Sequence, residues 1–168
     1  AMFDLLGWRY EYEPYDLPGW LPDFLLLGEC KTLVEVKPYT TFEEYETKKL
    51  TQAITEDTEV PREVLLLGAS LTWTDDEDHP VALGWLGQVV ARADERWIDL
   101  DFAPAILVRS REGFDFHHRD GSWMGRMTGA LPPAQTVMRP DEADWMWQQA
   151  GNAVQWKRNS PNPPLARG

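Results

Sequence analysis

Two carboxylates and an amine stand in apolar segments near the start of the chain, where burial favours uncharged side chains. Asp23 follows Pro22 at the beginning of one apolar run, and Glu35 and Lys37 stand two residues apart in another. Such charges are costly to bury unless they pair or hold an ion. Converging carboxylates bind an oxygen-seeking cation such as Mg²⁺ or Mn²⁺, which can polarise a phosphodiester and lower the pKa of a bound water. A neighbouring lysine can orient that water or stabilise charge that develops on phosphorus.

Two short strands joined by a tight connection are the elements expected to position these residues. Side chains repeat every two residues along a strand, so Glu35 and Lys37 share one face while Val36 takes the other. The connection over residues 28–32 is short enough for a hairpin, which brings Asp23 near Glu35 at the end of the sheet. We therefore predict a metal site on Asp23 and Glu35, with Lys37 as the catalytic amine and the main-chain carbonyl of Val36 as a further ligand.

The order of these residues resembles a known nuclease motif. Asp23 followed by Glu35-Val36-Lys37 is similar to the PD-(D/E)xK motif of the restriction-endonuclease-like nucleases, with an apolar strand around each part. The resemblance covers about the first 70 residues. It points to a phage and transposon subgroup in which a strand like residues 8–14 precedes LPDF and VEVK segments. It implies an α/β fold with a mixed central sheet flanked by helices, Mg²⁺ or Mn²⁺ as cofactor, and hydrolysis of DNA phosphodiester bonds.

Further polar positions are candidates for the same site. Glu13 ends the strand before Asp23 and could reach the metal, although a solvated carboxylate at a sheet end is the alternative. A capping-box pattern predicts a helix from about Thr40 to Glu56. Related folds often place a polar helix residue beside the reaction centre, and Gln52 is the candidate here. Lys48 and Lys49 are candidate contacts to DNA phosphates, with an ordinary solvated helix face as the alternative.

The remaining pattern predicts a single α/β domain over residues 1–158. The continuous apolar run 63–68 is typical of a strand that follows a crossover helix in a parallel β-α-β unit. Short strands over residues 81–86, 97–102, 105–109 and 113–127, with a hairpin turn at Asp120-Gly121, predict an added β-hairpin layer. A closing helix is expected over 140–158, with acidic residues at the positive end of its dipole. The Pro- and Asn-rich segment 159–168 is expected to be a disordered tail.

Composition limits the classes of function. The 168 residues are 43% hydrophobic and include nine Trp, which favours one folded core over disorder. No apolar run reaches the length that spans a bilayer, so we expect no membrane protein. The N-terminus lacks the features of a secretion signal, so a cytoplasmic location is expected. Cys30 is the only cysteine and supports neither a disulfide nor a thiolate zinc site.

The formal net charge of −12 opposes binding to nucleic acid, because affinity for phosphate comes largely from Lys and Arg that displace counterions. A bound cation and a local group of basic residues can offset that total. DNA is the partner that the nuclease resemblance implies, bound by one chain, by a homodimer or beside a partner protein. Two alternatives stay open: a non-catalytic acidic protein that retains the fold and mimics DNA or binds a partner, and a structural protein of a phage or mobile element.

The resemblance also implies a first helix that carries another acidic ligand. Only residues 3–6 of such a helix precede Gly7, and Asp4 lies too close to that stop to take the ligand's usual place. A missing carboxylate removes both charge and geometric constraint from the cation. We therefore expect weak or absent cleavage by this chain, even with its other site residues intact.

Overall fold

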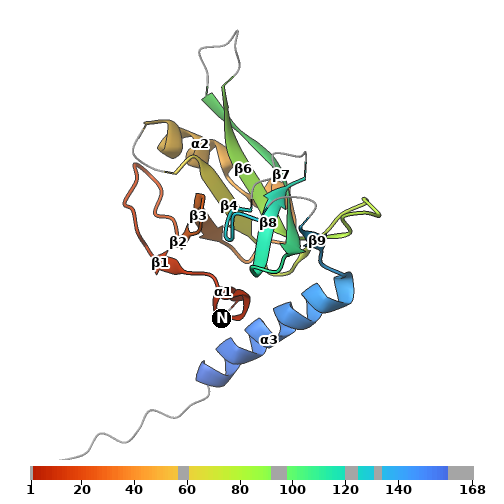
Figure 1. Cartoon of the computed structure of the whole chain (residues 1–168). Coiled ribbons are helices and arrows are strands. Elements are labelled where there is room, and N and C mark those ends of the chain that lie inside the picture. The colour runs from red at the N-terminus through yellow and green to blue at the C-terminus, as the bar shows by residue number, and fades with distance from the viewer. Residues whose placement is uncertain (1, 57–60, 92–97, 120–124, 131–133, 159–168) are drawn as a thin grey trace, which may run out of the picture.

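The computed structural model describes residues 2–56, 61–91, 98–119, 125–130 and 134–158, which form one curled, mixed sheet flanked by helices (Figure 1). Its strand order is β1-β2-β3-β4-β6-β7-β8, with β5 paired to β6 and β9 paired to β7. The strands are β1 (Tyr10–Tyr12), β2 (Phe24–Leu27), β3 (Lys31–Val36), β4 (Glu63–Leu67), β5 (Thr72–Trp73), β6 (Val81–Ala91), β7 (Ile98–Arg109), β8 (Phe114–His118) and β9 (Thr136–Val137). The helices are α1 (Met2–Leu6), α2 (Thr47–Glu56) and α3 (Pro140–Arg158).

The first four strands and α2 form the part of the fold that positions the predicted site. β1, β2 and β3 pair antiparallel in sequence, with Phe24 opposite Val34 in the β2–β3 pair. β4 then pairs parallel with β3, so Val36 lies opposite Leu67. Parallel neighbours need a crossover connection, and α2 lies within it. The predicted hairpin and the predicted β-α-β unit are both confirmed.

Alternation along these strands divides the apolar side chains between two faces of the sheet. One face, here called the α2 face, packs against α2 through a cluster that includes Trp20, Leu25, Leu33, Tyr45, Leu50, Ile54, Val64 and Leu66. The other, here called the α1/α3 face, packs against α1 and α3 through a cluster that includes Phe3, Leu6, Leu26, Val34, Leu65, Leu67, Phe116 and Met146. Figure 1 shows α1 beside α3, with α2 across the sheet from them.

α2 begins at Thr47, so the predicted helix start near Thr40 is wrong. Glu44 accepts hydrogen bonds from the main-chain N–H groups of Thr40 and Thr41 at 2.8 and 2.9 Å, and these bonds lower its pKa. The segment that they cap is a single 3₁₀ turn, after which Tyr45 is extended, with φ −80° and ψ 135°. The break allows the Tyr45 ring to enter the α2 face, where it is buried.

The predicted β-hairpin layer is also wrong, because β6, β7 and β8 extend the same sheet. The outer edge of β4 carries main-chain N–H and C=O groups that need partners, and the antiparallel strand β6 supplies them. Two short strands were expected on either side of Pro104, but β7 is continuous there. Pro104, which has no N–H to donate, lies opposite Trp85, beside a register shift in β6 between Ala82 and Trp85. The hairpin turn predicted at Asp120-Gly121 lies outside the described residues.

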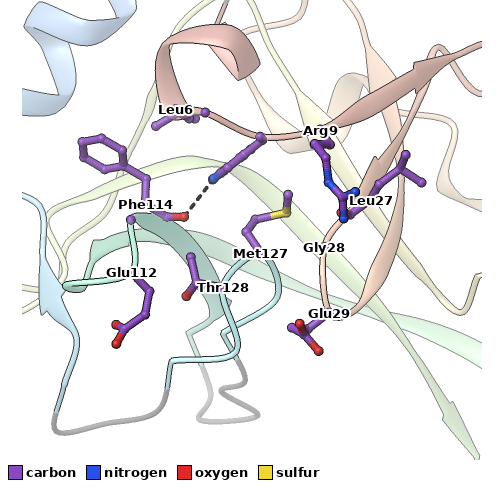
Figure 2. Close-up of a pocket in the computed structure, with 12 residues that line it drawn as sticks. Leu6, Arg9, Leu27, Gly28, Glu29, Glu112, Phe114, Met127 and Thr128 are labelled. Carbon is purple, nitrogen blue, oxygen red and sulfur yellow. Dashed lines mark hydrogen bonds between the residues drawn. The ribbon is translucent and has the colours of Figure 1, made fainter.

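Because the sheet is curled, β8 lies beside the segment that follows α1. Trp8 donates its indole N–H to the main-chain carbonyl of Phe114 at 2.8 Å (Figure 2). Both residues belong to the wall of a cavity of about 260 Å³. Close to this contact, Arg126 is 1% exposed and forms two hydrogen bonds with Glu63 of β4, at 2.7 and 3.0 Å. Cys30, in the β2–β3 turn, donates to the main-chain carbonyl of Arg126 at 3.0 Å. These contacts tie the site-bearing hairpin to the distant end of the chain.

The closing helix α3 spans Pro140–Arg158, as predicted. Its Ala143 and Met146 are buried against the α1/α3 face, whereas Trp145 is 60% exposed. None of the described helices combines the length and the apolar character that crossing a bilayer requires. The tail predicted over 159–168 lies outside the described residues.

Arg126→Ala should lower the free energy of unfolding by about 3–5 kcal/mol, because it removes the buried guanidinium and leaves the partly buried carboxylate of Glu63 without its cationic partner. The Gln88 amide still donates to that carboxylate. Arg109→Ala is the matched control. It removes a more exposed pair with Glu142 and should cost no more than about 1 kcal/mol. Urea denaturation measures both values. Equal small losses would show that the Arg126 pair does not support the fold.

Candidate functional site

The carboxyl end of β3 carries the predicted reaction centre. Glu35 and Lys37 share one face of the strand, as alternation predicts, and Lys37 Nζ lies 2.6 Å from Glu35 Oε1. Asp23 immediately precedes β2, and its Oδ2 accepts a hydrogen bond from the Val36 N–H at 2.7 Å. The β2–β3 hairpin thus brings Asp23, Glu35 and Lys37 to the same end of the sheet.

Glu35 is a buried carboxylate, and both of its oxygens have partners. Its exposed fraction is 7%. Oε1 accepts from Lys37, and Oε2 accepts a hydrogen bond from Trp20 Nε1 at 2.8 Å. The hydrogen bond to Glu35 raises the pKa of Lys37. Lys37 is therefore a cation at neutral pH, so it can stabilise negative charge but cannot act as a general base.

A tight turn between β1 and β2 positions Trp20. The main-chain N–H groups of Leu17 and Trp20 each donate to the other residue's carbonyl at 3.0 Å. Pro18 followed by Gly19, whose φ is +75°, is the arrangement of a type II turn. Trp20 is a residue of this site that the sequence pattern did not predict. The Pro-Gly pair signals the turn, and a buried indole N–H needs an acceptor, but neither signal identifies Glu35 as that acceptor.

A cavity of about 260 Å³ lies beside the Glu35–Lys37 pair on the α2 face. Tyr39 and Tyr45 line it and pack edge to face, with ring centroids 5.0 Å apart. The Tyr45 hydroxyl is buried, and none of the described residues forms a hydrogen bond with it. Burial, together with the nearby charge of Glu35, raises the pKa of Tyr45 to about 12. The cavity therefore contains a second group that stays protonated at neutral pH.

The direction in which each side chain leaves α2 determines which of the predicted site residues on this helix reach the cavity. Lys49 lines it and pairs with Glu46. Lys48 and Gln52 instead line a different cleft, of about 590 Å³, between α2 and β7. There the Gln52 amide donates to Glu56 at 2.7 Å. The structure thus places Lys49 near the predicted centre and places Lys48 and Gln52 elsewhere, because successive helix residues point about 100° apart.

Glu13, a predicted metal ligand, and Asp4, the acidic residue of the first helix, each lie beside a tyrosine. The Glu13 main-chain N–H donates to the Asp23 carbonyl at 3.0 Å, while its carboxylate bonds the Tyr12 hydroxyl and raises that group's pKa. Asp4 accepts a hydrogen bond from the Tyr10 hydroxyl at 3.2 Å. Tyr10 packs on the α1/α3 face, across the sheet from Glu35. Asp4 therefore does not join the Glu35 cavity.

The donor atoms near β3 fit only a sparsely coordinated divalent cation. Across the described ranges, no three His, Cys, Asp or Glu side chains are grouped to hold a metal ion. The available donors are the Asp23 and Glu35 carboxylates and the Val36 carbonyl. Mg²⁺ is usually held by one or two carboxylates together with water and substrate phosphates. This donor set fits that mode, provided that Glu35 exchanges its bond to Lys37 for the cation.

Tyr45→Phe should leave the free energy of unfolding unchanged or raise it by up to about 1 kcal/mol, because it removes a buried hydroxyl that lacks a partner. Trp20→Phe should lower that free energy by about 1.5–3 kcal/mol, since Glu35 Oε2 loses its donor while still buried. Urea denaturation compares the two. A loss in Tyr45→Phe as large as that in Trp20→Phe would mean that the hydroxyl is bonded in solution.

Comparison with known proteins identifies no relative. No protein-family model matches the sequence, and neither a curated protein nor a solved structure matches the chain. The geometry of the described residues is therefore the basis for a functional proposal.

Proposed function

We propose that this chain is a metal-dependent nuclease that hydrolyses DNA phosphodiester bonds at the carboxyl end of β3. One observation carries the proposal: the Glu35–Lys37 ion pair lies on the strand whose Val36 N–H binds Asp23 from the neighbouring hairpin strand. These are the residues on which the resemblance to PD-(D/E)xK nucleases rests.

The location of these residues is further support. In open α/β sheets, ligands bind outside the carboxyl ends of the strands. β3 and β4 run parallel, so both end beside the cavity that Glu35 and Lys37 line. The cavity is open to a substrate there and also contains Lys49, a second cation that could contact phosphate.

The site residues would have two roles, metal binding and stabilisation of the charge on phosphorus. Asp23, Glu35 and the Val36 carbonyl would hold Mg²⁺ or Mn²⁺, which when bound supplies Lewis acidity and a water of lowered pKa. Lys37, kept cationic by its raised pKa, would leave Glu35 and stabilise the charge that develops on phosphorus. With no more than two carboxylates for the cation, we expect weak metal binding and slow cleavage.

A second candidate is a non-catalytic acidic protein that binds a partner or mimics DNA. Both oxygens of Glu35 are already bonded, and the ammonium group of Lys37 supplies the positive charge that a metal would otherwise supply. The formal net charge of −12 also agrees with an acidic binding surface. In this candidate the Glu35–Lys37 pair is a structural contact.

Plasmid nicking separates these two candidates. With Mg²⁺ or Mn²⁺ the wild-type chain should nick supercoiled DNA, and Lys37→Ala should slow the reaction by about 100-fold or more, as loss of a transition-state donor typically does. Lys31→Ala is the matched control, because Lys31 is an exposed lysine at the opposite end of β3. Absence of metal-dependent nicking by the wild-type chain would contradict the nuclease proposal.

Titration calorimetry tests the metal site directly. Wild-type protein should bind Mn²⁺, and Asp23→Ala should abolish the binding, because one of only two carboxylate ligands is lost. Equal binding by the two proteins would place the cation elsewhere. If the wild-type chain binds no Mn²⁺ with or without DNA, the non-catalytic candidate is the correct one.

A further inference from the structure

A second cavity, of about 180 Å³, lies at the same strand end but on the α1/α3 face. Four aromatic side chains line it: Phe3 from α1, Tyr10 from β1, Phe24 from β2 and Trp147 from α3. Val36 and Leu67 add apolar surface, and none of the described residues that line the cavity is charged. We refer to it as the aromatic cavity.

The aromatic cavity has a well-defined wall that solvent can reach. Tyr10 and Phe24 pack edge to face, with ring centroids 5.6 Å apart and an interplanar angle of 86°. The hydrogen bond from the Tyr10 hydroxyl to Asp4 restrains the Tyr10 ring. Val36 is 40% exposed at the edge of the cavity. A ligand could therefore enter without disrupting the core.

One strand separates the aromatic cavity from the Glu35–Lys37 cavity. Val36 lines the first and Lys37 lines the second, because neighbouring side chains on a strand take opposite faces. Their Cα atoms are about 3.8 Å apart. The carboxylate of Asp23 lies at this boundary, bonded to the Val36 N–H. A nucleotide that contacts both cavities would therefore pass around the end of β3.

The charge of the chain favours a base contact over additional phosphate contacts. Lys37 and Lys49 are the cations that line the Glu35 cavity, and the chain as a whole carries −12. Few phosphates can be neutralised by so small a set, so little affinity comes from displaced counterions. Stacking on aromatic side chains contributes about 1–3 kcal/mol per base and requires no net positive charge.

We propose that the aromatic cavity binds one unpaired nucleobase next to the phosphate that Lys37 contacts. The substrate is then DNA with a single-stranded segment at the cut, since a base inside an intact duplex cannot leave its stack without an energetic cost. This assignment deepens the proposed nuclease function and rests on it for the position of the phosphate.

Binding of a fluorescent oligothymidylate tests the proposal, with a chelator present so that neither metal binding nor cleavage contributes. The full chain should bind this oligonucleotide more tightly than a blunt duplex. Trp147→Leu should weaken binding by about 5- to 150-fold, the equivalent of one stacked base, and Trp147→Phe should restore most of the affinity, because its ring can still stack. Trp145→Leu is the matched control: Trp145 is an exposed tryptophan outside the cavity on the same helix, so affinity should be unchanged.

Salt dependence gives a second readout. If one or two lysines contact phosphate, the logarithm of the binding constant should fall with the logarithm of salt with a slope between about −0.7 and −1.4. A much steeper slope would show that phosphate contacts dominate and would overturn the proposal. Equal affinities of Trp147→Leu and Trp147→Phe would also overturn it.

Three outcomes distinguish this proposal from the alternatives. Oligonucleotide binding that depends on the ring at 147, in a chain that never nicks DNA, keeps the base site and rejects the nuclease. Nicking that is lost in Lys37→Ala but unaffected by Trp147→Leu keeps the nuclease and rejects the base site. A dimer that Trp147→Leu dissociates, with oligonucleotide affinity unchanged, would mean that a second copy fills the cavity and would also reject it.

Discussion

A buried carboxylate on a central strand is the constraint around which this end of the molecule is arranged. Glu35 is almost inaccessible to water and would destabilise the fold if it were left unpaired. One partner, Lys37, comes from the same strand, and the other, Trp20, comes from the turn between β1 and β2. Because both partners approach on the α2 face, the carboxylate links the hairpin, its preceding loop and the cavity beside α2 in one polar contact.

The same strand end has different chemistry on its two sides. Acid, lysine and tyrosine hydroxyl groups occupy the α2 face, whereas uncharged aromatic and aliphatic side chains occupy the α1/α3 face. Asp23 lies between them because it bonds the main chain of Val36 rather than a side chain on either face. The base site proposed above assigns the anionic part of a nucleotide to the first surface and its flat base to the second.

The local sequence pattern predicted some elements correctly and others incorrectly. Two-residue alternation predicted that Glu35 and Lys37 share a face, and the short connection after β2 predicted the hairpin. The helix start was wrong because Glu44 does cap main-chain N–H groups, but burial of Tyr45 interrupts the helix immediately afterwards. The added layer was wrong because strand pattern shows that strands exist but not which edge they join; the unpaired edge of β4 decided that.

The sequence by itself determined the elements whose signals are local: the hairpin that carries Asp23 and Glu35, the buried strand after the crossover helix, and the closing helix from Pro140. Only the tertiary structure decided which side chains share a cavity. Lys48 and Lys49 are neighbours in sequence, yet the rotation of α2 sends them to separate clefts. Trp20 reaches Glu35, and Trp147 lines one cavity with Phe24, only because segments distant in the chain pack together. Such contacts depend on the relative placement of whole elements, which residue spacing within any one of them does not specify.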